Sequence, residues 1–216
     1  MSTQSTTSAS RPGPVPSFPN LVVAPCLSRF DIPAQEYLSI NGQPWDGIAV
    51  GALVFSTGPR VLLIQRSKTD SLPEKWEIPS GVVSNDPQKD MTITKAVARE
   101  LWEEAGLTAS RLTRLISAPA DDDMIPSLDE GFVFSNSTKT KVFCRYVFEV
   151  EVEENLDEGI CVKLNPYEHQ DFVWATEGDL RSLRTLGDGR ELDLTSDHLK
   201  RLILEGFKSK RQPQPN

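Results

Sequence analysis

The hydrophobic and polar positions of the chain follow two periods, which predict strands and helices in turn. A continuous apolar run at residues 48–55 predicts a buried strand, and the Ser-Thr-Gly-Pro turn after it predicts a hairpin with a second strand at 61–66. Residues 141–152 alternate between apolar and polar side chains, which predicts a long strand with one exposed face. Shorter strands are expected at 76–79, 112–118 and 172–174.

Three segments carry the spacing of an amphipathic helix, at residues 91–105, 177–183 and 196–207. In the last segment four apolar residues share one helical face, which we expect to pack against the core: Leu199, Leu202, Ile203 and Phe207. Strands that alternate with helices along the chain predict an α/β fold with a mixed sheet.

The two ends of the chain differ in composition from the segment between them. Residues 1–28 are rich in Ser, Thr and Pro in their first two thirds, and residues 209–216 are basic and Pro-containing. Such segments bury little apolar surface, so we expect disordered tails at 1–28 and 209–216 around one domain at 29–208. The first segment also lacks the charged start and apolar core of a secretory signal.

Length and charge restrict the classes of function. A chain of 216 residues with 38% hydrophobic content can bury one sizeable core. A net charge of −8 argues against bulk nucleic acid as a partner, and no apolar run has the length of a membrane span. Three cysteines without metal-binding spacing are expected to be reduced and largely buried, which favours a cytoplasmic protein. The oligomeric state stays open, a homodimer included.

The most informative stretch is the run of eight residues from Arg99 to Gly106. On a helix, Glu100, Glu103 and Glu104 share one face, because positions i, i+3 and i+4 are neighbours. Their repulsion costs a few tenths of a kcal/mol per pair, and a hard cation such as Mg²⁺ or Mn²⁺ would remove it. A solvated acidic face is the alternative that the triplet alone leaves open.

The sequence around the triplet resembles the Nudix box of the diphosphate hydrolases. A short apolar strand and glycine turn at 76–83 come first, and Gly106 follows the helix, where a left-handed residue is expected. The family pattern is Gly, five residues, Glu, seven residues, and then a conserved half. That half matches here at Arg99, Glu100, Leu101, Glu103, Glu104, Gly106 and Leu107. The resemblance covers about residues 45–207. Residues 76–107 look like a group of fungal Nudix proteins, which suggests a eukaryotic cytosolic enzyme.

The first half of the box departs from the family pattern. Gly81 and Arg99 are separated by four residues more than the pattern has, and Met91 stands where the first glutamate of the box belongs. Asp90 is expected to cap the start of the helix, and it could also replace part of the role of the missing glutamate. Asp86, in the preceding turn, is the other candidate for that role.

The resemblance implies a Nudix-type α/β/α sandwich and a set of site residues. In the family, Glu100, Glu103 and Glu104 would hold Mg²⁺ or Mn²⁺, with the backbone carbonyl of Gly81 as a further ligand. Glu103 and Glu104 would thereby be catalytic, and Arg99 would hold a glutamate in place through its planar guanidinium group.

The general base is a box glutamate in some relatives and an acid from a loop near the end of the sheet in others. In this chain that loop is residues 167–171. Glu168 is the preferred candidate, followed by Asp171 and His169. An exposed loop residue without a role is the alternative for each of them.

The implied activity is hydrolysis of a diphosphate linkage in a nucleoside diphosphate derivative or another small organic diphosphate by metal-activated water. A non-catalytic Nudix-fold binding or regulatory module is the alternative. A diphosphate isomerase of the same fold is a third possibility, but its histidine-rich metal site is hard to build from two histidines.

Overall fold

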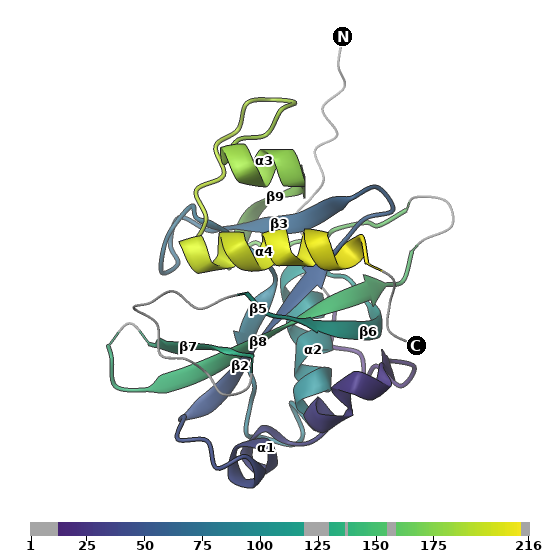
Figure 1. The fold of residues 1–216 in the computed structure, drawn as a ribbon, viewed down its shortest axis with the longest axis vertical. Helices are drawn as coiled ribbons and strands as arrows, with labels where there is room; N and C mark the ends of the chain where they lie inside the picture. Colours follow the sequence, from purple (N-terminus) through teal and green to yellow (C-terminus); the bar gives the residue numbers. More distant parts are fainter. Residues whose placement is uncertain (1–12, 119–129, 137, 155–158, 213–216) are drawn as a thin grey trace.

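The central strand of the fold is β2 (Gly47–Val54), whose eight residues are all buried. The computed structural model describes residues 13–118, 130–136, 138–154 and 159–212. A six-stranded mixed sheet surrounds β2, with β8 parallel to it on one edge and β5 antiparallel on the other. Its other strands are β1 (Val22–Val23), β5 (Ser80–Val82), β6 (Ala109–Ile116), β7 (Phe132–Ser135) and β8 (Val142–Val152) (Figure 1).

A second, antiparallel sheet has β3 (Arg60–Arg66) between β4 (Trp76–Glu77) and β9 (His169–Thr176). The predicted hairpin of residues 48–55 and 61–66 is therefore wrong as a pairing. A bridge between Phe55 and Val61 joins the two strands at the turn, after which they diverge into different sheets. Because β5 and β8 occupy both edges of β2, β3 pairs with β4 and β9 instead.

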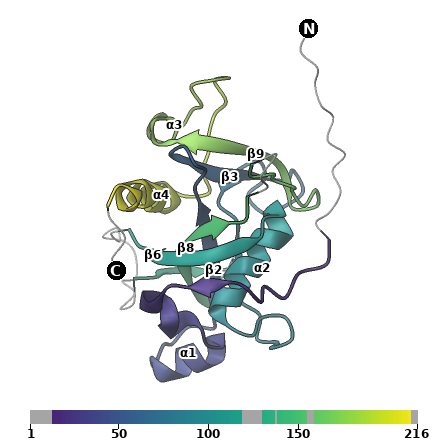
Figure 2. The same cartoon turned by 90° about the vertical axis from the view of Figure 1, so that its right-hand side faces the viewer.

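Helices lie on both sides of the larger sheet, as Figure 2 shows for α2 and α4. The helices are η1 (Pro25–Phe30, a 3-10 helix), α1 (Ala34–Ile40), α2 (Ile93–Ala105), α3 (Glu177–Ser182) and α4 (Asp197–Lys210). The alternation of β2 explains the two cores, because Ile48, Val50 and Ala52 join the core of α2 and Leu53 joins that of α4. The predicted α/β class with a mixed sheet is confirmed.

The last helix confirms its predicted inner face. The side chains of Leu199, Leu202, Ile203 and Phe207 are all buried between α4 and the two sheets. The helix begins after Ser196, whose hydroxyl accepts a hydrogen bond from the Leu199 N–H, and it extends to Lys210, past the expected end of the domain. Among the described residues, no helix is long and apolar enough to cross a membrane.

Part of the N-terminal segment before residue 29 contacts the rest of the fold. From Gly13 onward the chain lies against the domain: Phe18 is buried, β1 pairs with β6, and η1 buries Leu27. The Trp102 indole N–H donates to the Gly13 carbonyl, and the Lys95 ammonium donates to the Phe18 carbonyl. Phe18 and Leu27 of this segment thus pack into the larger core, whereas Val15 is 44% exposed. Residues 1–12 and 213–216 of the predicted tails lie outside the described residues.

The three cysteines also differ in part from expectation. All are free thiols, and Cys144 is buried in the larger core, but Cys26 and Cys161 are exposed. Burial of Cys144 follows from its position on β8, which pairs with β2.

Candidate active site

Helix α2 carries the acidic triplet, and its two ends are capped by different means. At its start the Thr92 hydroxyl accepts a hydrogen bond from the Lys95 N–H, so the predicted capping by Asp90 is wrong. At its end Gly106 adopts the left-handed conformation, with φ of 66°, and donates its N–H to the Trp102 carbonyl.

Arg99 is the centre of a buried ionic network on α2. Its guanidinium contacts both Asp90 oxygens at 2.6 and 2.7 Å, Glu103 at 2.6 Å and Glu100 at 2.7 Å. Burial alone would lower the pKa of Arg99, but the hydrogen bonds and charges of Asp90 and Glu100 raise it above its ordinary value. Arg99 therefore contacts both Glu100 and Glu103.

Asp90 is the acid that anchors this network. Its side chain is 0% exposed, and one of its oxygens also accepts the Ser84 N–H at 2.7 Å. Asp86 lies in an exposed turn and accepts the Gln88 N–H, whereas the Met91 side chain is 66% exposed. Of the two candidates for the role of the missing box glutamate, Asp90 is the one that contacts Arg99.

Gly81 lies directly against Glu100. A Cβ atom at residue 81 would lie 2.3 Å from the carboxyl carbon of Glu100, so only glycine lets that carboxylate approach β5. Burial raises the pKa of Glu100 despite the opposing charge of Arg99. The glycine of the box is thus required by the packing of the acid helix on the sheet.

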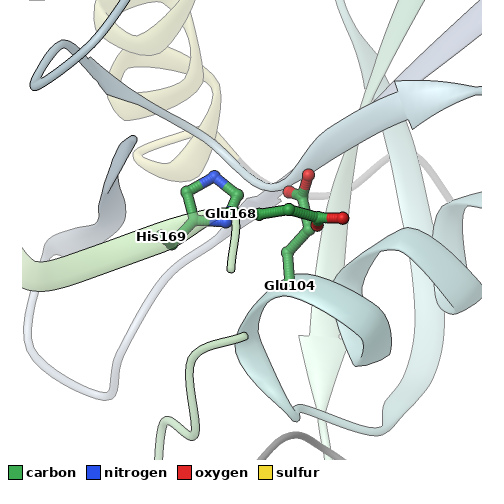
Figure 3. A group of neighbouring side chains, drawn as sticks. All are labelled: Glu104, Glu168 and His169. Carbon is green, nitrogen blue, oxygen red and sulfur yellow. The ribbon is translucent and has the colours of Figure 1, made fainter. Parts of the chain in front are cut away.

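Glu104 faces a different part of the site from its two helix neighbours. Its carboxylate is buried and accepts the Ser80 N–H at 2.8 Å. Burial, followed by the charges of Glu77 and Glu100, raises the pKa of Glu104 well above its ordinary value. Ligand atoms of Glu104, Glu168 and His169 lie within 4.8 Å of one another (Figure 3). The structure therefore divides the predicted triplet: Glu100 and Glu103 contact Arg99, and Glu104 faces the loop before β9.

That loop is attached to the end of α2 through backbone hydrogen bonds. The Lys163 N–H donates to the Ala105 carbonyl at 2.8 Å, and the Asn165 N–H donates to the Glu104 carbonyl at 3.1 Å. The Asn165 carbonyl in turn accepts the N–H groups of Glu168 and His169 at 3.1 and 2.8 Å. The end of the acid helix thereby determines where Glu168 lies.

The three candidates for the base have different surroundings. Asp171 pairs with Arg190 at 2.9 Å, and the His169 ring is buried with its Nε2 atom 3.3 Å from Glu77. Glu168 is exposed and directed toward Glu104 (Figure 3). Glu168 is thus the candidate with both access to solvent and proximity to the buried acid.

A layer of charge behind the site was not predicted from the sequence. Glu77 is buried and accepts a hydrogen bond from Arg66 at 2.5 Å, and Arg66 also contacts Asp70 at 2.6 Å. Burial lowers the pKa of the nearby Arg145, partly offset by the charges of Glu77 and Glu104. A glutamate inside the apolar strand at 76–79 was the one signal in the sequence that could have indicated this layer.

Comparison with known proteins identifies the domain. The family model described as the NUDIX domain matches residues 45–195, which is more than half of the chain. The chain belongs to the Nudix family. Among solved structures of the Nudix fold, it is similar to a MutT protein from Methanosarcina mazei Go1, at 22% identity over 77% of this chain and 96% of that one, with a TM-score of 0.53.

A second similar structure is a Nudix hydrolase from Nitrosomonas europaea, at 17% identity over 77% of this chain and 92% of that one, with a TM-score of 0.51. At these identities the similarity shows the shared Nudix fold. A comparison with curated protein sequences found no match. The expected resemblance to fungal Nudix proteins stays a prediction.

Proposed function

We propose that this Nudix protein is a hydrolase that cleaves the diphosphate linkage of a small organic diphosphate with Mg²⁺ or Mn²⁺. The observation that carries the proposal is the buried Glu104 carboxylate, which meets Glu168 beside two acids held by Arg99. Carboxylates gathered in this way raise one another's free energy unless positive charge compensates them, which favours a site for a divalent cation.

The residues present fit a divalent cation. Burial and three neighbouring carboxylates oppose the charge of Glu104, and a hard cation with oxygen ligands would compensate that charge. Glu100, Glu103 and Glu104, with the Gly81 carbonyl, remain the proposed ligands. When bound, the cation would neutralise the diphosphate oxygens and lower the pKa of a water molecule.

The other residues of the site position the metal-binding acids or accept a proton. Arg99 and Asp90 hold Glu100 and Glu103 in fixed positions, so that these acids need no reorganisation when substrate enters. The Ser80 N–H fixes one oxygen of Glu104. Glu168, exposed and close to Glu104, would accept the proton of the attacking water.

The alternative, a non-catalytic Nudix-fold binding module, is the less favoured proposal. Met91 leaves the first acid of the box absent from its usual position, which would suit such a module. Asp90 lies beside it and forms two contacts with Arg99, which supports the hydrolase instead.

The test is release of phosphate and nucleotide from a panel of organic diphosphates with Mg²⁺ and then Mn²⁺. The Glu103→Gln, Glu104→Gln double variant serves as the blank, with the same fold checked by circular dichroism. Metal-dependent turnover that the variant lacks would support the hydrolase, and equal turnover in both proteins would contradict it. Binding of Mg²⁺ without turnover of any diphosphate would instead favour the binding module.

A further inference from the structure

A groove of about 530 Å³ runs along α2 beside the proposed metal ligands. One wall is the N-terminal segment, with Val15 and Phe18, and the other is the four-residue-longer loop before α2, with Lys89 and Met91. Arg99 and Glu103 of α2 also line it. Neither wall belongs to the part of the box that matches the family pattern, so both are features of this chain.

The groove is continuous with the hollow that contains the proposed base. That second hollow, of about 580 Å³, is lined by Glu103 and Glu168, and it shares Val15, Lys89 and Glu103 with the groove. A molecule whose diphosphate lies between Glu103 and Glu168 would therefore extend its remaining part into the groove.

Two large apolar side chains that line the groove are exposed to solvent. Met91 is 66% exposed and Val15 is 44% exposed, and both are large apolar side chains that water contacts in the free protein. Covering such side chains releases about 25 cal/mol for each Å² of apolar surface. Because Asp90 turns inward to Arg99, position 91 is free to present an apolar side chain where the family pattern has an acid.

Lys89 stands at the junction of the groove and the hollow. It forms no ion pair within the part of the chain that the structure describes, and its charge acts on Glu100. An ammonium group at the entrance to an acidic site is suited to a phosphate oxygen that faces away from the acids.

We propose that this groove binds the apolar organic group of the diphosphate substrate, and that Lys89 contacts its phosphate. The proposal rests on the function proposed above, since it assigns the substrate's diphosphate to the space between Glu103 and Glu168. It names the substrate class as a diphosphate ester of an apolar group.

Binding of two probes tests the groove without turnover. The probes are the methyl and octyl esters of methylenediphosphonic acid, whose P–C–P bridge resists hydrolysis, titrated calorimetrically with Mg²⁺ present. The intact protein should bind the octyl ester about tenfold more tightly than the methyl ester, since two or so buried methylenes suffice for that ratio. Val15→Ser with Met91→Ser should reduce the ratio to about two.

Two further variants separate the charge from the apolar wall. Lys89→Ala should weaken both esters by the same factor, about tenfold, and leave their ratio unchanged. Ile40→Ser is the matched control, because Ile40 is 68% exposed at the end of α1 and lies outside the groove. It should change neither affinity.

The outcomes distinguish the groove from the hydrolase. Equal affinity for both esters, a preference that the serine variants leave intact, or no binding of either ester would overturn the groove. Hydrolysis of the corresponding P–O–P esters, measured separately, reports on the proposed activity. Tighter binding of the octyl ester without hydrolysis would support the groove and contradict the hydrolase. Hydrolysis with equal binding of the two esters would support the hydrolase and contradict the groove.

Discussion

Replacement of Gly81 by alanine should lower the activity of the site because it displaces the Glu100 carboxylate. The new Cβ would lie 2.3 Å from the carboxyl carbon and one oxygen of Glu100, whereas ordinary contact needs about 3.5 Å. Glu100 must therefore retreat by about 1 Å, and a misplacement of that size near reacting atoms costs about 100-fold in rate. That factor corresponds to about 2.7 kcal/mol of activation free energy.

The assay is kcat with the best diphosphate of the panel, together with urea unfolding of each variant. Gly58→Ala is the control, because nothing lies within 4 Å of the Cβ it would add. In the wild-type background, Gly81→Ala should also destabilise by about 1–3 kcal/mol. In a Glu100→Ala background it should cost little, since the three atoms nearest the new Cβ all belong to Glu100. An unchanged kcat in Gly81→Ala would refute the reasoning about Glu100, and equal destabilisation in both backgrounds would refute the steric account.

Other perturbations test the charges of the site. The folded chain binds the proton of the Glu104 carboxyl more tightly than the unfolded chain does, because the pKa of Glu104 is raised above about 4.5. Without metal, the free energy of unfolding should therefore fall as the pH rises from about 4.5 through that raised pKa. Glu104→Gln should flatten this dependence in thermal unfolding and abolish turnover. Asp90→Asn should lower the free energy of unfolding in urea by about 1–3 kcal/mol, since buried Arg99 loses one charged partner and keeps Glu100 and Glu103. Adding Met91→Glu should not restore that loss, because position 91 faces solvent; full recovery would contradict the assignment. Excess EDTA should stop turnover and leave the far-ultraviolet circular dichroism unchanged, and Mg²⁺ should raise Tm.

The acid helix shows what local pattern can predict. The spacing of Glu100, Glu103 and Glu104 and the glycine after them predicted a helix at 91–105, and α2 begins two residues later and ends at the same residue. The glycine cap at the end and the apolar face are local properties that a single segment can predict, whereas the cap at the start was assigned to Asp90 and is formed by Thr92. The family pattern of this segment is local as well, and its resemblance to the Nudix box predicted the fold.

Contacts between distant segments could not be predicted in this way. The pairing of Asp90 with Arg99 depends on how the longer loop folds back over nine residues, and the pattern favoured a helix cap instead. The meeting of Glu104 with His169 depends on the path of β9 in a second sheet. The packing of Phe18 against α2 depends on a partner far along the chain, and composition alone predicted a tail.

The backbone hydrogen bonds between α2 and the loop of Glu168 determine which substitutions this site can tolerate during evolution. Because Lys163 and Asn165 dock through main-chain N–H groups, most substitutions of the Lys163 side chain would leave the two halves of the site in the same alignment. Gly106 has no such freedom, since a Cβ there would lie 2.8 Å from that of Lys163 and the residue has a positive φ. At this contact, the loop residue Lys163 can therefore be substituted without loss of the alignment, whereas Gly106 at the end of α2 cannot.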